Sequence, residues 1–327
     1  MRNRVAFIIP YFGKLPDMYY LWLKSAEAEC NKIYDFKIYT DIAEINGNDK
    51  NIQVKRMRFD DFVNKIQSNY KFDIQCNKAI KVCDFRPAFG EIFKEDLRDY
   101  DWWGYVEWDL IMGDLSKYIT DEILDKYEKL YVLGHMALFK NIDKINTIYK
   151  LTAKKNDLTY KEIFQNPENC SFEELARGKE NINEICYKNN IKMYNDNTYA
   201  DIYPYNYSFI RSIHNNEQSL KENKLVRIHD KTPEIFAYEK GCVYRYYLEE
   251  GKMKIEEVRY VHFQKRPMEI EPNINDDFVM VPNRIFSMAR NDITIDFIKR
   301  NSRNKIIYVH AIKMHINNKL KQYNIKK

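Results

Sequence analysis

The stretch YDWWGYVEWDLIMGDL, Tyr100–Leu115, joins an apolar run to two acids and suggests how the rest of the chain is organised. Its aromatic and aliphatic residues predict a strand that runs into the protein and ends at Glu107 and Asp109. Because residues two apart on a strand share a face, both carboxylates should point the same way. Gly113 and Asp114 follow, where the chain must turn. Convergent carboxylates at a sheet edge suit a divalent cation, a sugar hydroxyl, or both.

The N-terminal part predicts a strand, a helix and two further strands. Val5–Pro10 is a continuous apolar run, typical of a buried parallel strand. An apolar stripe over residues 16–30 predicts a helix, and Phe36–Thr40 and Ile52–Met57 predict strands. This order favours a doubly wound α/β sheet, whose ligands bind at the C-terminal strand ends. Asp41 and the acidic pair fall at such ends, and the sequence contains neither a dinucleotide fingerprint nor a P-loop.

Composition indicates a globular protein rather than a membrane or disulfide-rich one. The 327 residues are 45% hydrophobic and 31% charged, which suits one large α/β domain with a subdomain, or two small domains. No uncharged apolar run approaches the roughly 20 residues of a membrane span. We interpret the N-terminus as a first strand, not a signal peptide. The six cysteines form no CxxC, which favours a reducing cytoplasm.

Basic charge is concentrated at the C-terminus. Residues 297–327 hold nine Lys or Arg and no acid, which leaves 44 basic against 48 acidic residues elsewhere. Apolar residues in this tail are spaced as one helical face, so we expect a basic amphipathic helix that docks on an anionic membrane surface. A C-terminal helix packed on the body is the alternative. Nucleic-acid binding is not expected, because the body is net acidic.

Two segments carry further candidate side chains. Within Asn77–Phe93, Lys81, Asp84 and Arg86 lie in a region that Pro87 keeps from being helical, so a new helix should begin at Ala88. They form either a loop of solvated charges or a cationic lip that meets a phosphate.

Cys170–Gly178 predicts a short helix with Ser171 as its cap and Glu174 three residues on, a capping box. Glu173 beside it has no such capping role, but exposed glutamates are common in first helical turns because of the helix dipole. Before it, Lys129–Phe139 predicts a strand that Gly134-His135 interrupts.

The C-terminal third predicts an antiparallel hairpin from Val243–Tyr247 and Lys254–Val261. The second strand runs into His262, which Lys265-Arg266 soon follow. A single strand histidine is usually structural, but the adjacent basic pair favours a metal ligand beside phosphate-binding cations. Residues 268–296 are interpreted as connector and helix.

The blocks VAFIIPYFG, FKIYTD, KVCDFRP, WGYVEWDLIMGD, GHMALFKN, SFEE and VHFQKR, in this order, resemble the GT-A glycosyltransferases. More narrowly, they resemble glycosyltransferase-like proteins of bacterial surface-polysaccharide clusters. The resemblance covers roughly residues 1–267. It implies an α/β fold with a GT-A-like, mostly parallel central sheet flanked by helices, a β-hairpin and a C-terminal helical extension. The implied catalytic domain is 1–267, with a nucleotide-binding half (1–115) and an acceptor half (116–267), followed by a basic extension (268–327).

The resemblance also implies roles for the acidic stretch. The family's DxD motif stands here as Glu107-Trp108-Asp109, with Glu replacing the first Asp. Asp109 would bind the metal, and Glu107 would contact the ribose or the metal through water. His262 would be a further metal ligand.

The remaining implied roles concern the nucleotide and the catalytic base. The residues expected to hold the nucleotide or its diphosphate are Asp41, Lys81, Asp84, Arg86 and Lys265. The acidic pair before the acceptor helix appears as Glu173-Glu174, so one of these would be the base, with Glu174 favoured.

The sequence therefore predicts an inverting glycosyltransferase that uses Mn²⁺ or Mg²⁺ and a nucleotide-sugar donor, most plausibly a UDP-hexose. The acceptor would be a lipid-linked surface polysaccharide, and the tail would hold this cytoplasmic protein at the inner membrane surface. Two alternatives stay open: a metal-dependent phospho- or nucleotidyltransferase, and a non-catalytic glycan- or nucleotide-binding module that uses the tyrosines of 199–207 for stacking.

Overall fold

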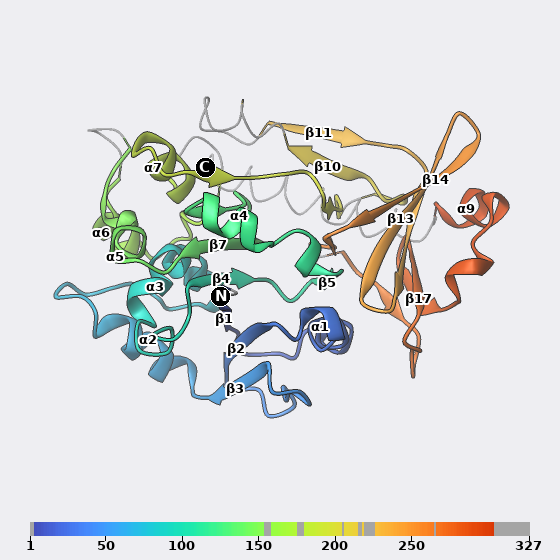
Figure 1. Cartoon of the computed structure of the whole chain (residues 1–327). Coiled ribbons are helices and arrows are strands. Elements are labelled where there is room, and N and C mark those ends of the chain that lie inside the picture. The colour runs from blue at the N-terminus through green and yellow to red at the C-terminus, as the bar shows by residue number, and fades with distance from the viewer. Residues whose placement is uncertain are drawn as a thin grey trace, which may run out of the picture. The chain divides into compact units, whose positions relative to one another are not determined.

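The computed structural model describes residues 3–153, 158–174, 180–204, 206–214, 218, 226–264 and 266–303 (Figure 1). The chain divides into two compact units. Unit 1 contains Met1–Trp108, Leu115–Asp196 and His214–Val226, and unit 2 contains Asp109–Asp114, Asn197–Ile213 and Arg227–Lys327.

Unit 1 is built on a seven-stranded sheet of order β3-β2-β1-β4-β7-β6-β8. The strands are β1 Val5–Pro10, β2 Tyr34–Thr40, β3 Ile52–Arg56, β4 Trp102–Val106, β6 Lys129–Leu130, β7 Met136–Lys140 and β8 Met193–Tyr194. The strands from β3 to β4 run parallel to one another, β7 is antiparallel to both β4 and β6, and β6 is parallel to β8. The largely parallel sheet that the sequence predicts is thus confirmed.

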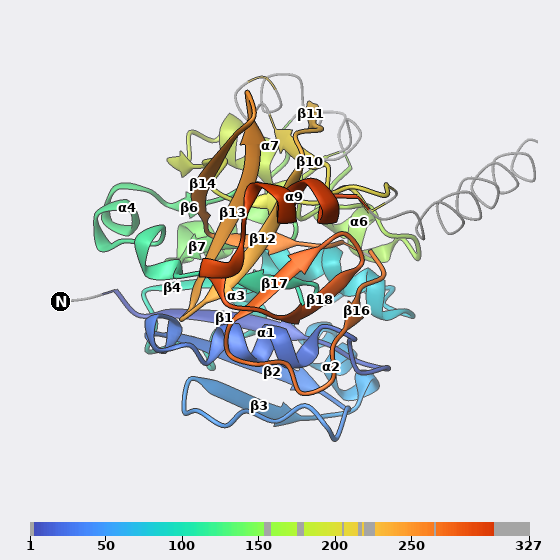
Figure 2. The ribbon, with the colours of Figure 1, turned by 90° about the vertical axis from the view of Figure 1, so that its right-hand side faces the viewer.

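Helices cover both faces of this sheet. They are α1 Tyr19–Ala26, α2 Phe59–Gln67, α3 Phe89–Ile92, α4 Asp121–Lys126, α5 Asp143–Asn146, α6 Tyr160–Gln165 and α7 Ile182–Lys188. A longer 3₁₀ segment spans Ala79–Ala88, and short 3₁₀ turns lie at Glu29–Asn31, Leu115–Lys117 and Ile148–Lys150. On one face, Trp22 of α1 packs against Phe36 of β2, and Figure 2 shows α1 over β1 and β2. On the other face, residues of α2, α3, α5, α6 and α7 share one apolar core with Ala6 and Ile8. The central strands β1 and β4 are therefore apolar, because both faces of the sheet are buried there.

Unit 2 is mainly antiparallel. Its six-stranded sheet has the order β14-β13-β12-β17-β18-β16. The strands are β12 Glu234–Glu239, β13 Cys242–Glu249, β14 Lys252–Val258, β16 Glu269–Ile270, β17 Phe278–Val281 and β18 Arg284–Ser287. Ile298 of α9 (Ile295–Asn301) packs with Ile235 and Tyr246 of this sheet. Two small sheets complete the unit: β5 (Leu110–Met112), β15 (Tyr260–His262) and β9 (Ala200–Asp201), and the pair β10 (Arg211–His214) and β11 (Arg227–Asp230).

Several local predictions are confirmed and others are wrong. The predicted hairpin is β13–β14, and its turn at Glu250-Gly251 has φ angles of 51° and 76°. Residues 268–296 are not connector and helix, because they contain β16, β17 and β18. The apolar run FVMV of β17 is short, and Asn283 with φ of 72° turns it directly into β18. α6 begins with a capping box of Thr159 and Glu162, and this helix was not predicted.

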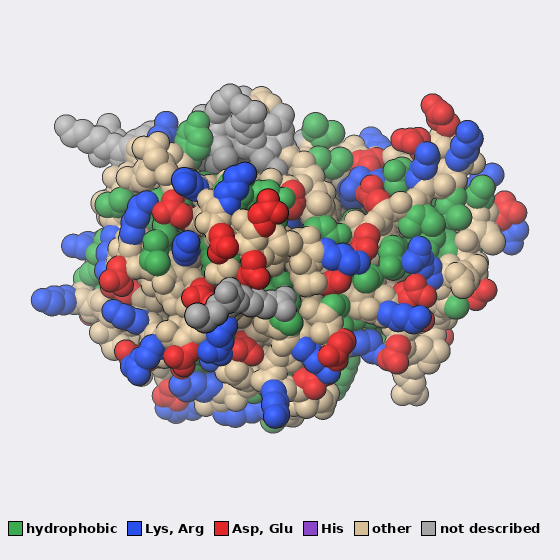
Figure 3. All heavy atoms as spheres, in the orientation of Figure 1, with side chains coloured by type: hydrophobic (Ala, Val, Ile, Leu, Met, Phe, Trp, Pro, Cys, Tyr) green, Lys and Arg blue, Asp and Glu red, His purple; other side chains and the backbone are tan. Residues whose placement is uncertain are grey.

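The described residues contain no helix that is long and apolar enough to cross a membrane. On the face drawn in Figure 3, the described Lys and Arg side chains are interspersed with Asp and Glu. The predicted amphipathic helix of the tail lies largely in residues 304–327, outside the described residues.

Candidate functional site

The acidic stretch divides between the two units. β4 ends at Val106, β5 begins at Leu110, and residues 107–109 between them are not part of a strand. Glu107 therefore belongs to unit 1 and Asp109 to unit 2. The strand end was predicted correctly, but the alternation of a strand does not apply to the two acids.

In unit 2, β15 brings His262 next to Asp109. β15 pairs antiparallel with β5, and His262 is opposite Leu110. The N–H of Phe263 donates to the carbonyl of Asp109 at 2.8 Å, which extends the pairing to Asp109. The Nε2 atom of His262 then lies 3.3 Å from Oδ1 of Asp109. Two side chains from distant blocks of the sequence are thus adjacent within one small sheet.

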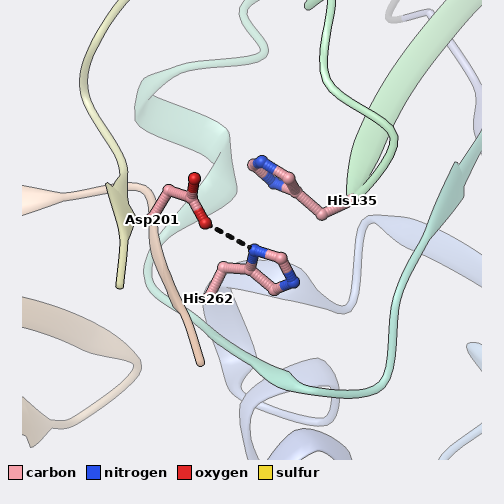
Figure 4. Close-up of side chains that lie close together, drawn as sticks. All are labelled: His135, Asp201 and His262. Carbon is pink, nitrogen blue, oxygen red and sulfur yellow. Dashed lines mark hydrogen bonds and ion pairs between the residues drawn. The ribbon is translucent and has the colours of Figure 1, made fainter. Parts of the chain in front are cut away.

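The other imidazole nitrogen of His262 has a carboxylate partner that sequence reasoning missed. Nδ1 lies 2.9 Å from Oδ1 of Asp201 on β9 (Figure 4). β9 is parallel to β15, with Asp201 opposite His262. The side-chain amide of Gln264 also donates to Oδ1 of Asp201, at 2.8 Å. The available signal was one acid in the stretch YADIY, whose tyrosines suit sugar stacking in the alternative of a binding module.

In unit 1, Arg86 forms an ion pair with Glu107. The Nη1 atom of Arg86 donates to Oε1 of Glu107 at 2.8 Å and to the carbonyl of Gly134 at 2.9 Å. The carboxylate of Glu173 lies 4.0 Å away. Burial opposes the charge on Arg86, but its neighbours Cys83, Glu107 and Glu173 raise its pKa well above the ordinary value. The guanidinium is therefore permanently charged and fixes the orientation of the Glu107 carboxylate.

Glu173 and Glu174 lie beside the same glycine but in different environments. The N–H of Gly134 donates to Oε2 of Glu174 at 3.1 Å. The Glu173 side chain is buried, and Tyr105 donates to its main-chain carbonyl at 3.2 Å. Burial, and then repulsion by Glu174, raise the pKa of Glu173 to about 8 although Arg86 opposes the shift. Glu173 thus keeps its proton in neutral solution more readily than an ordinary glutamate.

The predicted capping box of Ser171 and Glu174 is wrong. Residues 171–174 form a turn rather than a first helical turn, and Ser171 has φ of 56°. Its hydroxyl donates to Asn169 at 3.2 Å. The Glu174 side chain accepts the N–H of Gly134, a residue far from this turn in the sequence. The rest of the predicted helix, residues 175–179, lies outside the described residues.

Lys81 and Asp84 do not form an exposed cationic lip. Their side chains, 1% and 0% exposed, form an ion pair of 2.7 Å inside unit 1. Lys81 also donates to the carbonyls of Ile163 and Glu168. Asp84 accepts the N–H groups of Cys170 and Phe172. Because these contacts satisfy both charges, the pair has a structural role, and we do not retain it as a nucleotide site.

Two predicted residues remain. Asp41 follows β2, is exposed, and accepts the N–H of Gly13, which has φ of 105°. It therefore lies next to the loop after β1, at the C-terminal edge of the sheet. Lys265 lies outside the described residues.

The donors in unit 2 fit a divalent cation. An imidazole nitrogen and a carboxylate oxygen lie close together, and the Asp109 side chain is 33% exposed whereas that of His262 is 8% exposed. A carboxylate with an imidazole suits Mn²⁺, whereas Mg²⁺ prefers oxygen ligands alone. Asp109 and His262 are the residues that would hold such a cation.

Comparisons with known proteins identify a family and solved structures of distant similarity. A crystal structure of an active-site mutant of LgtC is similar over 80% of this chain and 88% of that chain, at 12% sequence identity and a TM-score of 0.40. No curated protein matches the chain. The model of the family of unknown function DUF6625 matches residues 7–289, and the chain belongs to this family.

Proposed function

We propose that the protein is a metal-dependent glycosyltransferase that moves a sugar from a nucleotide-diphosphate donor to a hydroxyl acceptor. The observation that carries this proposal is the 3.3 Å approach of His262 Nε2 to Asp109 Oδ1. The sequence resemblance assigned both residues to one metal, although nothing in their spacing required them to meet. Their adjacency in unit 2 is what a shared cation needs.

The metal-binding residues in this proposal are Asp109 and His262. A bound Mn²⁺ or Mg²⁺ would neutralise the negative charge that develops on a diphosphate leaving group. Glu107 is proposed to bind the ribose or a metal-bound water, and Arg86 to keep its carboxylate oriented through the 2.8 Å contact. Asp41 is proposed to contact the base or the ribose.

Glu174 is the proposed general base of an inverting transfer. A base must be ionised before it can accept the proton of an acceptor hydroxyl. Burial and the charge of Glu174 raise the pKa of Glu173 to about 8, so Glu173 is mostly protonated near neutral pH. The N–H of Gly134 orients the carboxylate of Glu174. The environments of the two acids thus favour Glu174 for this role.

The proposal is tested by a screen of nucleotide sugars, UDP-hexoses first, with Mn²⁺ and lipid-linked glycan acceptors. We expect the wild type to release UDP, and Asp109→Ala and Glu174→Gln to release none above background. Asp114→Asn is the matched control, because Asp114 is an acid of the same stretch without a proposed role. Pyrophosphate or a nucleoside monophosphate as product would instead indicate a phospho- or nucleotidyltransferase. Donor binding without turnover would indicate a binding module, and full activity of Asp109→Ala would refute the site.

The basic tail is proposed to bind an anionic membrane surface that presents the lipid-linked acceptor. A protein that ends at Arg303 keeps α9 intact and lacks most of the tail. It should no longer sediment with vesicles that contain anionic lipid, whereas the full chain should do so at low salt. Equal sedimentation of the two proteins would contradict this role.

A further inference from the structure

We propose that Asp201 and Gln264 are positioning residues that fix the His262 imidazole for metal binding. The inference rests on the proposed function, because it assigns a purpose to contacts around a metal ligand. It adds two residues to which the sequence resemblance assigns no role. All of the side chains concerned, with Asp109, belong to unit 2.

The three-stranded sheet of unit 2 determines where these residues lie. β15 is the central strand, with β5 on one side and β9 on the other. Pairing with β5 places Asp109 beside His262, and pairing with β9 places Asp201 opposite His262. The N–H of Ile202 donates to the carbonyl of His262 at 2.9 Å and fixes the register after Asp201. His262 therefore has a carboxylate on either side, each from a different strand.

The two imidazole nitrogens face different partners. Nδ1 lies 2.9 Å from Asp201, and Nε2 faces Asp109 at 3.3 Å. A metal-binding histidine commonly donates its second N–H to a carboxylate, which fixes both the tautomer and the ring orientation. A proton on Nδ1, held by Asp201, leaves the Nε2 lone pair directed toward Asp109. Asp201 thereby sets which nitrogen of His262 can bind a cation.

Gln264 holds Asp201 in turn. Its amide donates to the same Oδ1 atom that faces His262, at 2.8 Å. The Gln264 backbone has φ of 53°, a left-handed conformation that costs a glutamine free energy. Gln264 lies two residues after His262, and in this conformation its side chain contacts Asp201. A strained residue that supports a buried carboxylate is expected where geometry must be held for function.

Asp201 acts through His262 rather than as a direct metal ligand. Its side chain is 3% exposed, whereas that of Asp109 is 33% exposed. Its Oδ1 atom is shared between His262 and Gln264. An incoming cation can therefore reach Asp109 more readily than Asp201. This difference yields a test that separates the two roles.

The experiment measures the Kd of Mn²⁺ for the full chain by the electron paramagnetic resonance of free Mn²⁺, without any donor sugar. Asp201→Ala should weaken binding by about 10- to 100-fold, the usual effect of losing a residue behind a metal ligand. Asp201→Asn keeps an acceptor for Nδ1 and should recover most of the affinity. Gln264→Ala should weaken binding less than Asp201→Ala. The matched control is Asp230→Asn, which alters an acid of unit 2 that pairs with Arg211 and Arg245.

A double mutant distinguishes positioning from direct binding. If Asp201 acts only through His262, Asp201→Ala should cause no further loss of Mn²⁺ affinity in a His262→Ala background. A full additional loss would make Asp201 an independent ligand and overturn the inference. An unchanged Kd for both Asp201→Ala and Asp201→Asn would overturn it as well, as would a wild-type protein that binds no Mn²⁺. A wild type that binds Mn²⁺ as predicted but transfers no sugar would refute only the proposed function.

Discussion

Replacing Lys81 by methionine should destabilise the protein without weakening nucleotide binding. The Lys81 ammonium lies 2.7 Å from Asp84 and also donates to the carbonyls of Ile163 and Glu168. Methionine has a similar length but no charge and no donor. The variant therefore leaves Asp84 as a buried negative charge that accepts main-chain N–H groups such as that of Phe172.

The size of the effect follows from this environment. Removing one partner of a buried ion pair costs about 3–5 kcal/mol, because the other charge stays buried. The main-chain donors to Asp84 offset part of that cost, so we expect a loss of about 3 kcal/mol in the free energy of unfolding. The double variant Lys81→Met, Asp84→Asn carries no unpaired charge and should recover part of the loss.

Urea denaturation measures the stability, and titration with UDP under native conditions measures nucleotide affinity. Lys78→Met is the control, because Lys78 is exposed and its replacement should change stability by less than about 0.5 kcal/mol. The reasoning would be refuted if Lys81→Met were as stable as Lys78→Met and had lost its affinity for UDP. That result would restore Lys81 as a nucleotide ligand.

Three further predictions concern buried groups and a helix cap. Burial and Glu174 raise the pKa of Glu173 from 4.5 to about 8, so the folded state retains a proton that the unfolded state releases. The unfolding free energy of the wild type should therefore fall as the pH rises from about 4.5 to about 8, by a few kcal/mol at about 1.4 kcal/mol per pKa unit. In urea titrations at several pH values, Glu173→Gln should not show this fall. If the unfolding free energies of the two proteins changed in parallel with pH, the assignment would be contradicted. Burial lowers the pKa of Lys129 from 10.5 to about 8, so the stability of the wild type should rise from about pH 8 toward pH 10.5. At neutral pH, Lys129→Met should raise the unfolding free energy by about 2 kcal/mol, a figure that already subtracts the lost hydrogen bond to the Tyr131 carbonyl. A less stable variant would show that the bond matters more than the charge. Thr159→Ala removes the cap of α6 and should cost about 1 kcal/mol by thermal unfolding. Thr147→Ala is the control, because the Thr147 side chain caps no helix. Equal losses would argue against the capping box.

Local patterns were sufficient for the elements that bury a continuous or alternating surface. β1 is apolar because the sheet is covered on both faces, β2 alternates apolar with polar residues over its first half, and the β13–β14 hairpin is marked by its glycine turn. The strands β5, β9 and β15 are only two or three residues long, too short for a pattern. Their pairing depends on contacts between distant segments, so the partnership of Asp201 with His262 could not be predicted from either segment alone.

The candidate site was predictable to a similar extent. Asp109 and His262 were proposed as partners through a resemblance of blocks, and the structure makes them neighbours in unit 2. Lys81 and Asp84 were misinterpreted because short runs of charge usually indicate solvent exposure. The 3₁₀ turn Ala79–Ala88 instead directs both side chains inward, where the main chain of 163–172 supplies their further partners. Sequence spacing shows that two charges can pair, but not whether they are buried.

The most direct test of the central claim is a crystal structure of the protein soaked with Mn²⁺ and UDP, with data collected at the manganese absorption edge. We predict an anomalous peak in bonding contact with both Oδ1 of Asp109 and Nε2 of His262, and no peak there in crystals of His262→Ala. A manganese ion bound elsewhere, or a peak that persists in crystals of His262→Ala, would contradict the assignment of this pair as the metal centre of a glycosyltransferase.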